Sequence, residues 1–119
     1  MVAEARQAML LQRVAFGADK MSAREALEIA TRGGAQVLGR SDVGQLVPGM
    51  RADIAVWDMK NVSAAGSWDP AALLLAGPGA VRDLYVEGRQ IVDRGAFVPF
   101  HLPTVIRRQN ELARELADG

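Results

Sequence analysis

The first segment, residues 2–17, constrains the fold most, because it predicts a helix with apolar side chains on two opposite sides. It has no proline and no internal glycine, and it is rich in residues that favour helices. A helix on the surface of a domain normally carries a single apolar face. We therefore expect this helix to be covered on two sides, one formed by Leu10, Leu11 and Val14 and the other by Val2, Ala5, Met9 and Phe16.

The next segment predicts helices over residues 22–31 and 34–38. Its start fits a capping box, in which the Ser22 hydroxyl accepts from the Glu25 amide and the Glu25 carboxylate reaches back. The glycines at positions 33 and 34 cost about 1 kcal/mol each relative to alanine, and they indicate a kink or a close approach by a neighbouring backbone. Gly39 is expected to stop the second of these helices.

From residue 41 to residue 100 the pattern changes to turns and short strands. Residues 42–44, 47–49 and 77–79 have turn chemistry, and residues 54–57 predict a strand. Strands over 81–86 and 90–92 flank a glycine-containing turn, which is typical of a β-hairpin. Between the strands 54–57 and 81–86, Asp69 and Pro70 favour the start of a short helix over 71–75. The chain ends in a predicted helix over 104–117 with Val105, Ile106, Leu112, Ala113 and Leu116 on one side.

These elements define an α+β fold in three segments: helical residues 1–40, β-rich residues 41–100 with a mostly antiparallel sheet, and a C-terminal helix in 101–119. A chain of 119 residues suits one domain. Its 14 basic and 14 acidic residues balance, so no basic excess favours nucleic acid. The absence of cysteine excludes thiolate metal sites. No apolar run approaches the roughly 20 residues that span a membrane, and we expect a cytoplasmic protein without nucleic-acid or membrane partners.

No catalytic or metal-binding residue is predicted in this chain. His101 is the sole histidine, and a metal site needs several clustered ligands, so a structural role is expected. Residues 44–51 hold two glycines at the spacing of a phosphate loop, but Met50 and Arg51 replace the lysine and hydroxyl that grip phosphate. We interpret this stretch as a turn.

The remaining polar and aromatic candidates favour structural roles as well. No serine lies in a Gly-x-Ser-x-Gly elbow, and the spacing brings no two carboxylates together for acid–base work. The tryptophans are expected to be core or interface anchors rather than ligand platforms. The residues considered are Ser22, Ser41, Ser63, Ser67, Asp53, Asp58, Asp69, Asp83, Asp93, Trp57 and Trp68.

Three stretches together resemble the C-terminal region of the amidohydrolase superfamily. Residues 26–39 are similar to its Ala-Leu-x-x-Ala-Thr-x-x-Gly-Ala-x-x-Leu-Gly helix pair. Residues 44–56 match its Gly-x-Leu-x-x-Gly-x-x-Ala-Asp-Ile-x-Val segment, and residues 86–95 resemble its closing hairpin. Residues 4–11 and 68–73 look most like the branch of 8-oxoguanine and guanine deaminases and chlorotriazine hydrolases.

The resemblance implies a parent enzyme with a (β/α)₈ barrel and a β-sandwich built from both chain ends. This chain would supply the last barrel helices, the C-terminal half of the sandwich and a terminal helix. The family's divalent metal, such as zinc or iron, is held by a His-x-His pair, two later histidines and an aspartate, and metal-bound water attacks the C–N carbon. None of these ligands maps onto this chain, so the chain alone is expected to be inactive, without a cofactor of its own.

Three hypotheses remain open. In the first, the chain is the C-terminal fragment of a deaminase-type hydrolase of purine- or triazine-like heterocycles. In the second, it is a stand-alone, non-catalytic assembly or binding module. In the third, it is a subunit that completes an enzyme supplied by another chain. On its own, the chain is expected to self-associate through the barrel-facing first helix and the open sheet edge.

Overall fold

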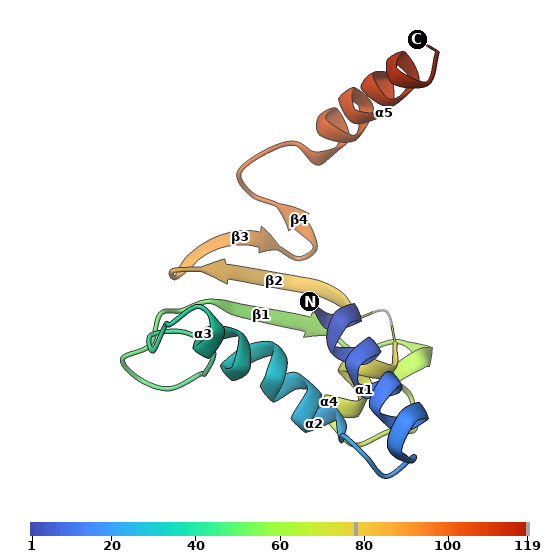
Figure 1. Cartoon of the computed structure of the whole chain (residues 1–119). Helices are drawn as coiled ribbons and strands as arrows, with labels where there is room; N and C mark the ends of the chain where they lie inside the picture. The colour runs from blue at the N-terminus through green and yellow to red at the C-terminus, as the bar shows by residue number, and fades with distance from the viewer. Residues whose placement is uncertain (78, 119) are drawn as a thin grey trace.

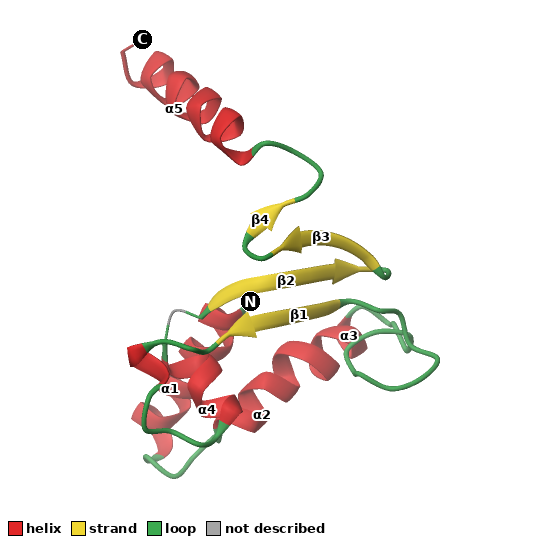
Figure 2. Cartoon of the chain, turned by 180° about the vertical axis from the view of Figure 1, so that it is seen from behind, coloured by secondary structure: helices red, strands yellow, loops and turns green. Residues whose placement is uncertain are grey.

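The computed structural model describes residues 1–77 and 79–118, and it places a cluster of helices beside a four-stranded sheet, with one helix projecting beyond the sheet (Figures 1 and 2). The mixed α+β character predicted from the sequence is confirmed. Pro78, in the predicted turn 77–79, and Gly119, at the chain end, lie outside the described residues. The elements are α1 (Val2–Phe16), α2 (Ala23–Glu28), η1 (Ile29–Gly33), α3 (Gly34–Val37), β1 (Ile54–Asp58), η2 (Val62–Ala64), α4 (Pro70–Ala76), β2 (Ala80–Val86), β3 (Arg89–Asp93), β4 (Ala96–Phe97) and α5 (Leu102–Asp118).

Local capping signals set the starts of α2 and α4 as predicted. The Ser22 hydroxyl accepts from the Glu25 amide at 3.2 Å, and the Glu25 carboxylate accepts from the Ser22 amide at 2.6 Å. The Asp69 carboxylate accepts from the Ala71 amide at 3.1 Å, with Pro70 in the first turn of α4. Each contact pairs a backbone N–H that has no partner within the helix.

The segment α2–η1–α3 runs as one rod whose hydrogen bonding widens to a π-helical turn over Ile29–Gly33. The helices predicted separately over 22–31 and 34–38 are therefore continuous, and both glycines keep helical φ and ψ values. The predicted close approach is wrong at Gly34, because an added Cβ there would meet no described atom within 4 Å. The close approach is made instead by Gly44, whose added Cβ would lie 3.0 Å from the Ala35 Cβ and 3.0 Å from the Thr31 carbonyl oxygen.

Gly39 ends the rod as predicted. Its φ of 65° is left-handed, and it donates its N–H to the Gln36 carbonyl while Arg40 donates to the Ala35 carbonyl. This pair of bonds is a Schellman motif. The chain then turns back along the α2–η1–α3 segment, and Gly44 contacts this segment before the chain enters the sheet.

The sheet has the order β1-β2-β3-β4 with all neighbours antiparallel. Val86 pairs with Arg89 across the predicted hairpin, and the two connecting residues, Glu87 and Gly88, have φ values of 53° and 77°. Positive φ at both positions is the geometry of a type I′ turn, which matches the twist of paired strands. Strand β4 was not predicted because two residues carry no alternating pattern.

The core is small and lies among α1, α2 and α4. Its buried members are four alanines and two longer side chains, Met9 and Leu75, which are 8% and 1% exposed. On α1, Ala5 and Met9 face this core, whereas the face with Leu10, Leu11 and Val14, which was expected to be covered as well, is open to solvent. Phe16, predicted on the covered face with Ala5 and Met9, is also exposed, at 68%.

Helix α5 contributes no residue to the core. It begins at Leu102, two residues earlier than predicted, because Pro103 falls in the first turn, where no backbone N–H is needed. Figure 1 shows it extending away from β4, opposite to the helical cluster. None of the helices formed by the described residues has both the length and the apolar character needed to cross a bilayer.

Candidate functional site

An apolar cavity of about 310 Å³ lies between the helices and β1. Residues of α1 and α2 form one wall, and the start of β1 forms the opposite wall. Asp53 is the one ionisable side chain among the described residues that line it, and its carboxylate accepts from the Glu87 amide at 2.7 Å. The cavity can hold an apolar group, but its walls offer no nucleophile with an adjacent base. Lining residues include Val2, Ala5, Leu27, Ile54, Trp57 and Leu74.

Potential metal ligands do not cluster in the part of the chain that the structure describes. Across residues 1–77 and 79–118, no three His, Asp or Glu side chains come together in a way that could hold a metal ion. His101 lies at the foot of α5, where its Nδ1 is 2.9 Å from the Thr104 hydroxyl. These residues do not fit the divalent metal that the family resemblance implies.

The aspartates considered as acid–base candidates make contacts with backbone amides or with arginine side chains. Asp58 accepts from the Lys60 amide, and Asp69 caps α4 and pairs with Arg24 at 2.8 Å. Asp83 is largely buried, and its carboxylate accepts from the Arg82 guanidinium at 2.7 Å and from the Arg94 amide at 3.1 Å. The Arg82 guanidinium, with the Arg94 amide, lowers the pKa of Asp83, so this carboxylate is a poor proton acceptor near neutral pH.

The two tryptophans differ in environment. Trp57 is half-buried and lines the apolar cavity, in agreement with an anchoring role. Trp68 is 95% exposed, so it is not a core residue of this chain. Among the serines, Ser22 is a cap as predicted, and the side chain of Ser63 lies outside the described residues.

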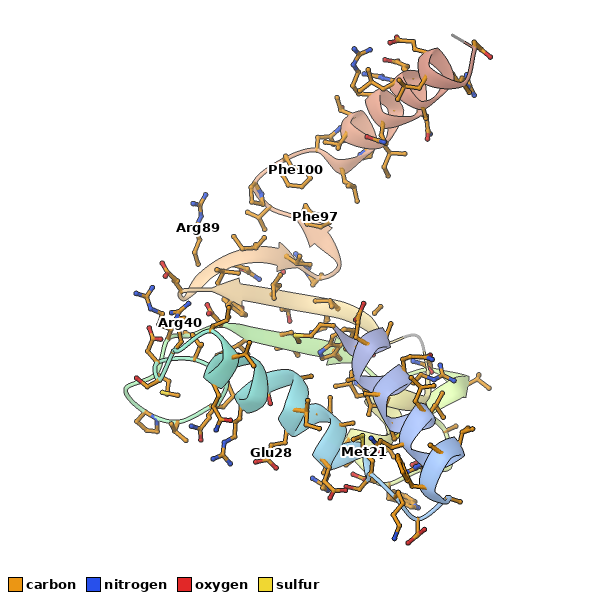
Figure 3. The ribbon with its side chains drawn as sticks, viewed as in Figure 1. Met21, Glu28, Arg40, Arg89, Phe97 and Phe100 are labelled. Atoms are coloured by element: carbon orange, nitrogen blue, oxygen red, sulfur yellow. The ribbon has the colours of Figure 1, made fainter. Side chains whose placement is uncertain are left out.

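The stretch that resembled a phosphate loop is part of a charged cluster formed by Arg40, Asp42, Arg51 and Glu87. The Asp42 carboxylate accepts from Arg40 at 2.8 and 2.9 Å and from Arg51 at 2.7 Å, and Arg51 also pairs with Glu87. Figure 3 places Arg40 at the end of the sheet that holds the β2–β3 turn. The cluster therefore ties the loop after Gly39 to that turn, and the guanidinium of Arg51 is already paired.

Acid should weaken this cluster. Arg40 first, and then Arg51, hold the pKa of Asp42 well below its ordinary value. A depressed folded-state pKa gives stability that is present above the unfolded-state pKa of about 3.9 and is lost as pH falls below it. We expect Asp42→Asn to destabilise the chain at pH 7, and the difference from wild type to shrink between about pH 5 and pH 2. Urea denaturation at several pH values measures this, and a pH-independent difference would contradict the assigned role.

The comparisons with known proteins agree with the resemblance in the sequence. Residues 1–91 match the family described as the amidohydrolase family. An 8-oxoguanine deaminase from Pseudomonas aeruginosa is 41% identical over 120 residues, covering 100% of this chain and 27% of the relative. An atrazine chlorohydrolase from Arthrobacter aurescens, crystallised with zinc, is 33% identical with a TM-score of 0.81 over 94% of this chain and 26% of its own.

A third comparison extends the fold to the whole chain. An adenosine deaminase structure from Xanthomonas campestris, solved with bound zinc, has a TM-score of 0.90 over 100% of this chain and 28% of its own, at 23% identity. The described arrangement of helices and antiparallel sheet is thus one that amidohydrolase-type enzymes contain. The chain belongs to the amidohydrolase family. It spans just over a quarter of the length of each of these three proteins.

Proposed function

We propose that this chain is the C-terminal portion of a metal-dependent, deaminase-type amidohydrolase, to which it contributes structure rather than catalytic groups. The observation that carries the proposal is the 41% identity to an 8-oxoguanine deaminase over the whole chain, which matches only 27% of that enzyme. The absence of a metal-holding cluster among the described residues supports a structural contribution. The substrate of the whole enzyme would be a purine- or triazine-like heterocycle.

The exposed surfaces of the described residues support a place within a larger protein. The outer face of α1, with Leu11 at 58% and Val14 at 86% exposure, is apolar, and the cavity beside β1 is apolar as well. In the proposed enzyme, this chain would form the last barrel helices and half of the sandwich. The remaining barrel and the other half of the sandwich would then cover these apolar surfaces. On its own, the chain would self-associate through the α1 face and the free edge of β1. We place it in the cytoplasm.

A chimera tests the structural role directly. The segment of the Pseudomonas aeruginosa deaminase that aligns with this chain would be replaced by residues 1–119, and 8-oxoguanine hydrolysis and bound metal would be measured. We expect the chimera to bind metal and to retain activity within about tenfold of the parent. The same parent without its C-terminal segment is the control and should be inactive. A folded, metal-loaded chimera without activity would contradict the proposal.

The isolated chain provides the complementary measurement. We expect no stoichiometric metal and no hydrolysis of 8-oxoguanine, guanine or chlorotriazines. Turnover with bound metal would overturn the proposal, because residues assigned structural roles would then form a site.

The two alternative hypotheses predict different surrounding genes. A stop codon before Met1 favours a stand-alone module. A neighbouring gene that encodes a barrel without its C-terminus favours a subunit of a split enzyme.

A further inference from the structure

The β2–β3 and β3–β4 connections are two-residue turns of the same kind. Glu87 and Gly88 join β2 to β3, with φ values of 53° and 77°. Arg94 and Gly95 join β3 to β4, with φ values of 46° and 81°. Positive φ at both positions defines a type I′ turn, for which Asn-Gly, Asp-Gly and Gly-Gly are the preferred pairs. Glutamate and arginine have a Cβ that disfavours the left-handed backbone, so the first position of each turn needs support from outside the turn.

The turn between β2 and β3 is supported by the residues that lead into β1. Glu87 donates its backbone N–H to the Asp53 carboxylate at 2.7 Å. Gly88 donates its N–H to the Ala52 carbonyl oxygen at 3.0 Å. Both amides of the turn are therefore bound by two consecutive residues of the neighbouring strand segment.

The turn between β3 and β4 is supported in the same way, one strand further along the sheet. Arg94 donates its backbone N–H to the Asp83 carboxylate at 3.1 Å. Gly95 donates its N–H to the Arg82 carbonyl oxygen at 2.8 Å. The second oxygen of the Asp83 carboxylate accepts from the Arg82 guanidinium at 2.7 Å, which fixes the orientation of the carboxylate.

The two arrangements have the same register. In each, the aspartate immediately precedes a residue whose partner on the adjacent strand lies two positions before the turn. These partners are Ile54 with Tyr85 and Leu84 with Val92. The same set of contacts therefore occurs twice in one sheet, although the two turns lie at opposite ends of it (Figures 1 and 2).

The contacts suit the chemistry of such turns. Backbone N–H groups need hydrogen-bond partners, and the ladder bonds of a hairpin join the residues that flank a two-residue turn. A carboxylate is the stronger acceptor for the first turn residue, because its charge assists the hydrogen bond. With the backbone held in this way, the first turn position can carry a long charged side chain. Glu87 uses its side chain to pair with Arg51.

We propose that Ala52-Asp53 and Arg82-Asp83 are two copies of one conformational device, a turn clamp, which holds a charged residue of the adjoining hairpin turn in the left-handed backbone conformation. Each clamp binds at two points, with the aspartate carboxylate on the first turn residue and the preceding carbonyl on the glycine. The two clamps have no residue in common, so each acts on its own turn. They lie within this chain and do not depend on the proposed catalytic parent.

Residue-resolved amide hydrogen exchange of the 119-residue chain tests the clamps one at a time. The readout is the protection factor, which is the exchange rate of an amide in an unfolded peptide divided by its rate in the protein. In Asp53→Ala, the protection factors of residues 87–88 should fall at least about tenfold, while those of residues 94–95 stay within about twofold of wild type. Asp83→Ala should show the reverse pattern.

Asp58→Ala is the matched control, because the Asp58 carboxylate accepts from the Lys60 amide and contacts neither turn amide pair. It should leave the protection of both turns unchanged. Asp83 is largely buried, so Asp83→Asn serves as a second variant that keeps the shape of the side chain and removes its charge. It should lower the protection of residues 94–95 by about threefold. Unchanged turn amides in the Asp53 and Asp83 variants, or equal losses at both turns in each variant, would overturn the proposal.

Substitution of the turn residue tests the conformation that the clamp holds. Asparagine adopts the left-handed conformation readily, and Asn-Gly is a preferred type I′ pair. Arg94→Asn, added to either Asp83 variant, should therefore restore the protection of Gly95 to within about threefold of wild type. Glu87→Asn in the same background lies in the other turn and should restore none. If Arg94→Asn failed to restore protection, or Glu87→Asn restored it equally, the aspartate would act on the sheet as a whole and the turn clamp would be wrong.

Discussion

Replacing Leu75 with alanine is expected to lower the free energy of unfolding by about 2–5 kcal/mol, which is a large part of the stability of a chain this size. Leu75 lies in α4, is 1% exposed, and is the longest side chain fully enclosed in the core among the described residues. The other buried members of this core are four alanines, which are too short to fill the space that the lost atoms would leave, and Met9. The cavity therefore adds to the lost transfer free energy.

Urea or guanidinium denaturation of the two proteins measures this effect, and Leu38→Ala is the matched control. Leu38 follows α3 and is 73% exposed, so the same chemical change there should shift stability by no more than about 0.5 kcal/mol. Equal losses for the two variants would show that the core is not centred on α1, α2 and α4. A loss below about 1 kcal/mol for Leu75→Ala would mean that the surrounding helices collapse onto the vacated space.

The elements that the sequence predicts correctly are those set by neighbouring residues. Ser22 and Glu25 sit three positions apart and cap α2 with each other, and Asp69 caps a helix that begins at the next residue. The hairpin follows from the turn residues Glu87 and Gly88, both of which adopt positive φ. In each case the interaction closes within a few residues, so local chemistry is sufficient.

The contacts that the sequence could not predict join distant parts of the chain. Gly33 and Gly34 were expected to mark a kink or a close approach, yet the close approach to this helical segment is made by Gly44, ten or more residues later. The ion pairs from Asp42 through Arg51 to Glu87 span more than forty residues, and charge spacing alone gives no sign of them. The sequence showed that α1 has two apolar faces, but it did not show that only the face with Ala5 and Met9 is covered within this chain, nor which helices cover it.

The candidate site follows the same division. Local motifs were enough to assign Gly44–Arg51 to a turn and Asp69 to a cap, and the structure agrees with both assignments. The apolar cavity beside β1 was not predicted, because its walls come from α1, α2, α4 and β1, which are separated by tens of residues. No sequence signal short of the tertiary fold would have brought Val2, Leu27 and Trp57 to one surface.

The second large effect is expected at Gly44, where alanine should lower the free energy of unfolding by about 2–4 kcal/mol. Two causes act together. The backbone φ of 92° is unfavourable for any residue with a Cβ, and that Cβ would lie 3.0 Å from both the Ala35 Cβ and the Thr31 carbonyl oxygen. Neither neighbour can move by rotating a side chain, because both atoms are fixed to the backbone of the rod. Relief of the clash must therefore displace the loop or bend the rod.

Gly34→Ala provides the control for Gly44→Ala. Gly34 has a helical φ of −60° with no described atom within 4 Å of an added Cβ, so alanine there should stabilise the chain by up to about 1 kcal/mol. Opposite signs for the two substitutions, read from denaturation midpoints, are the expected result. Amide hydrogen exchange should also accelerate at Arg51, which donates its N–H to the Asp42 carbonyl at 2.8 Å, when the loop is displaced in Gly44→Ala. If Gly44→Ala left the free energy of unfolding unchanged while amide exchange at Arg51 stayed slow, the loop would not contact the α2–η1–α3 segment. The close approach of Gly44 to Ala35 and Thr31 would then be wrong.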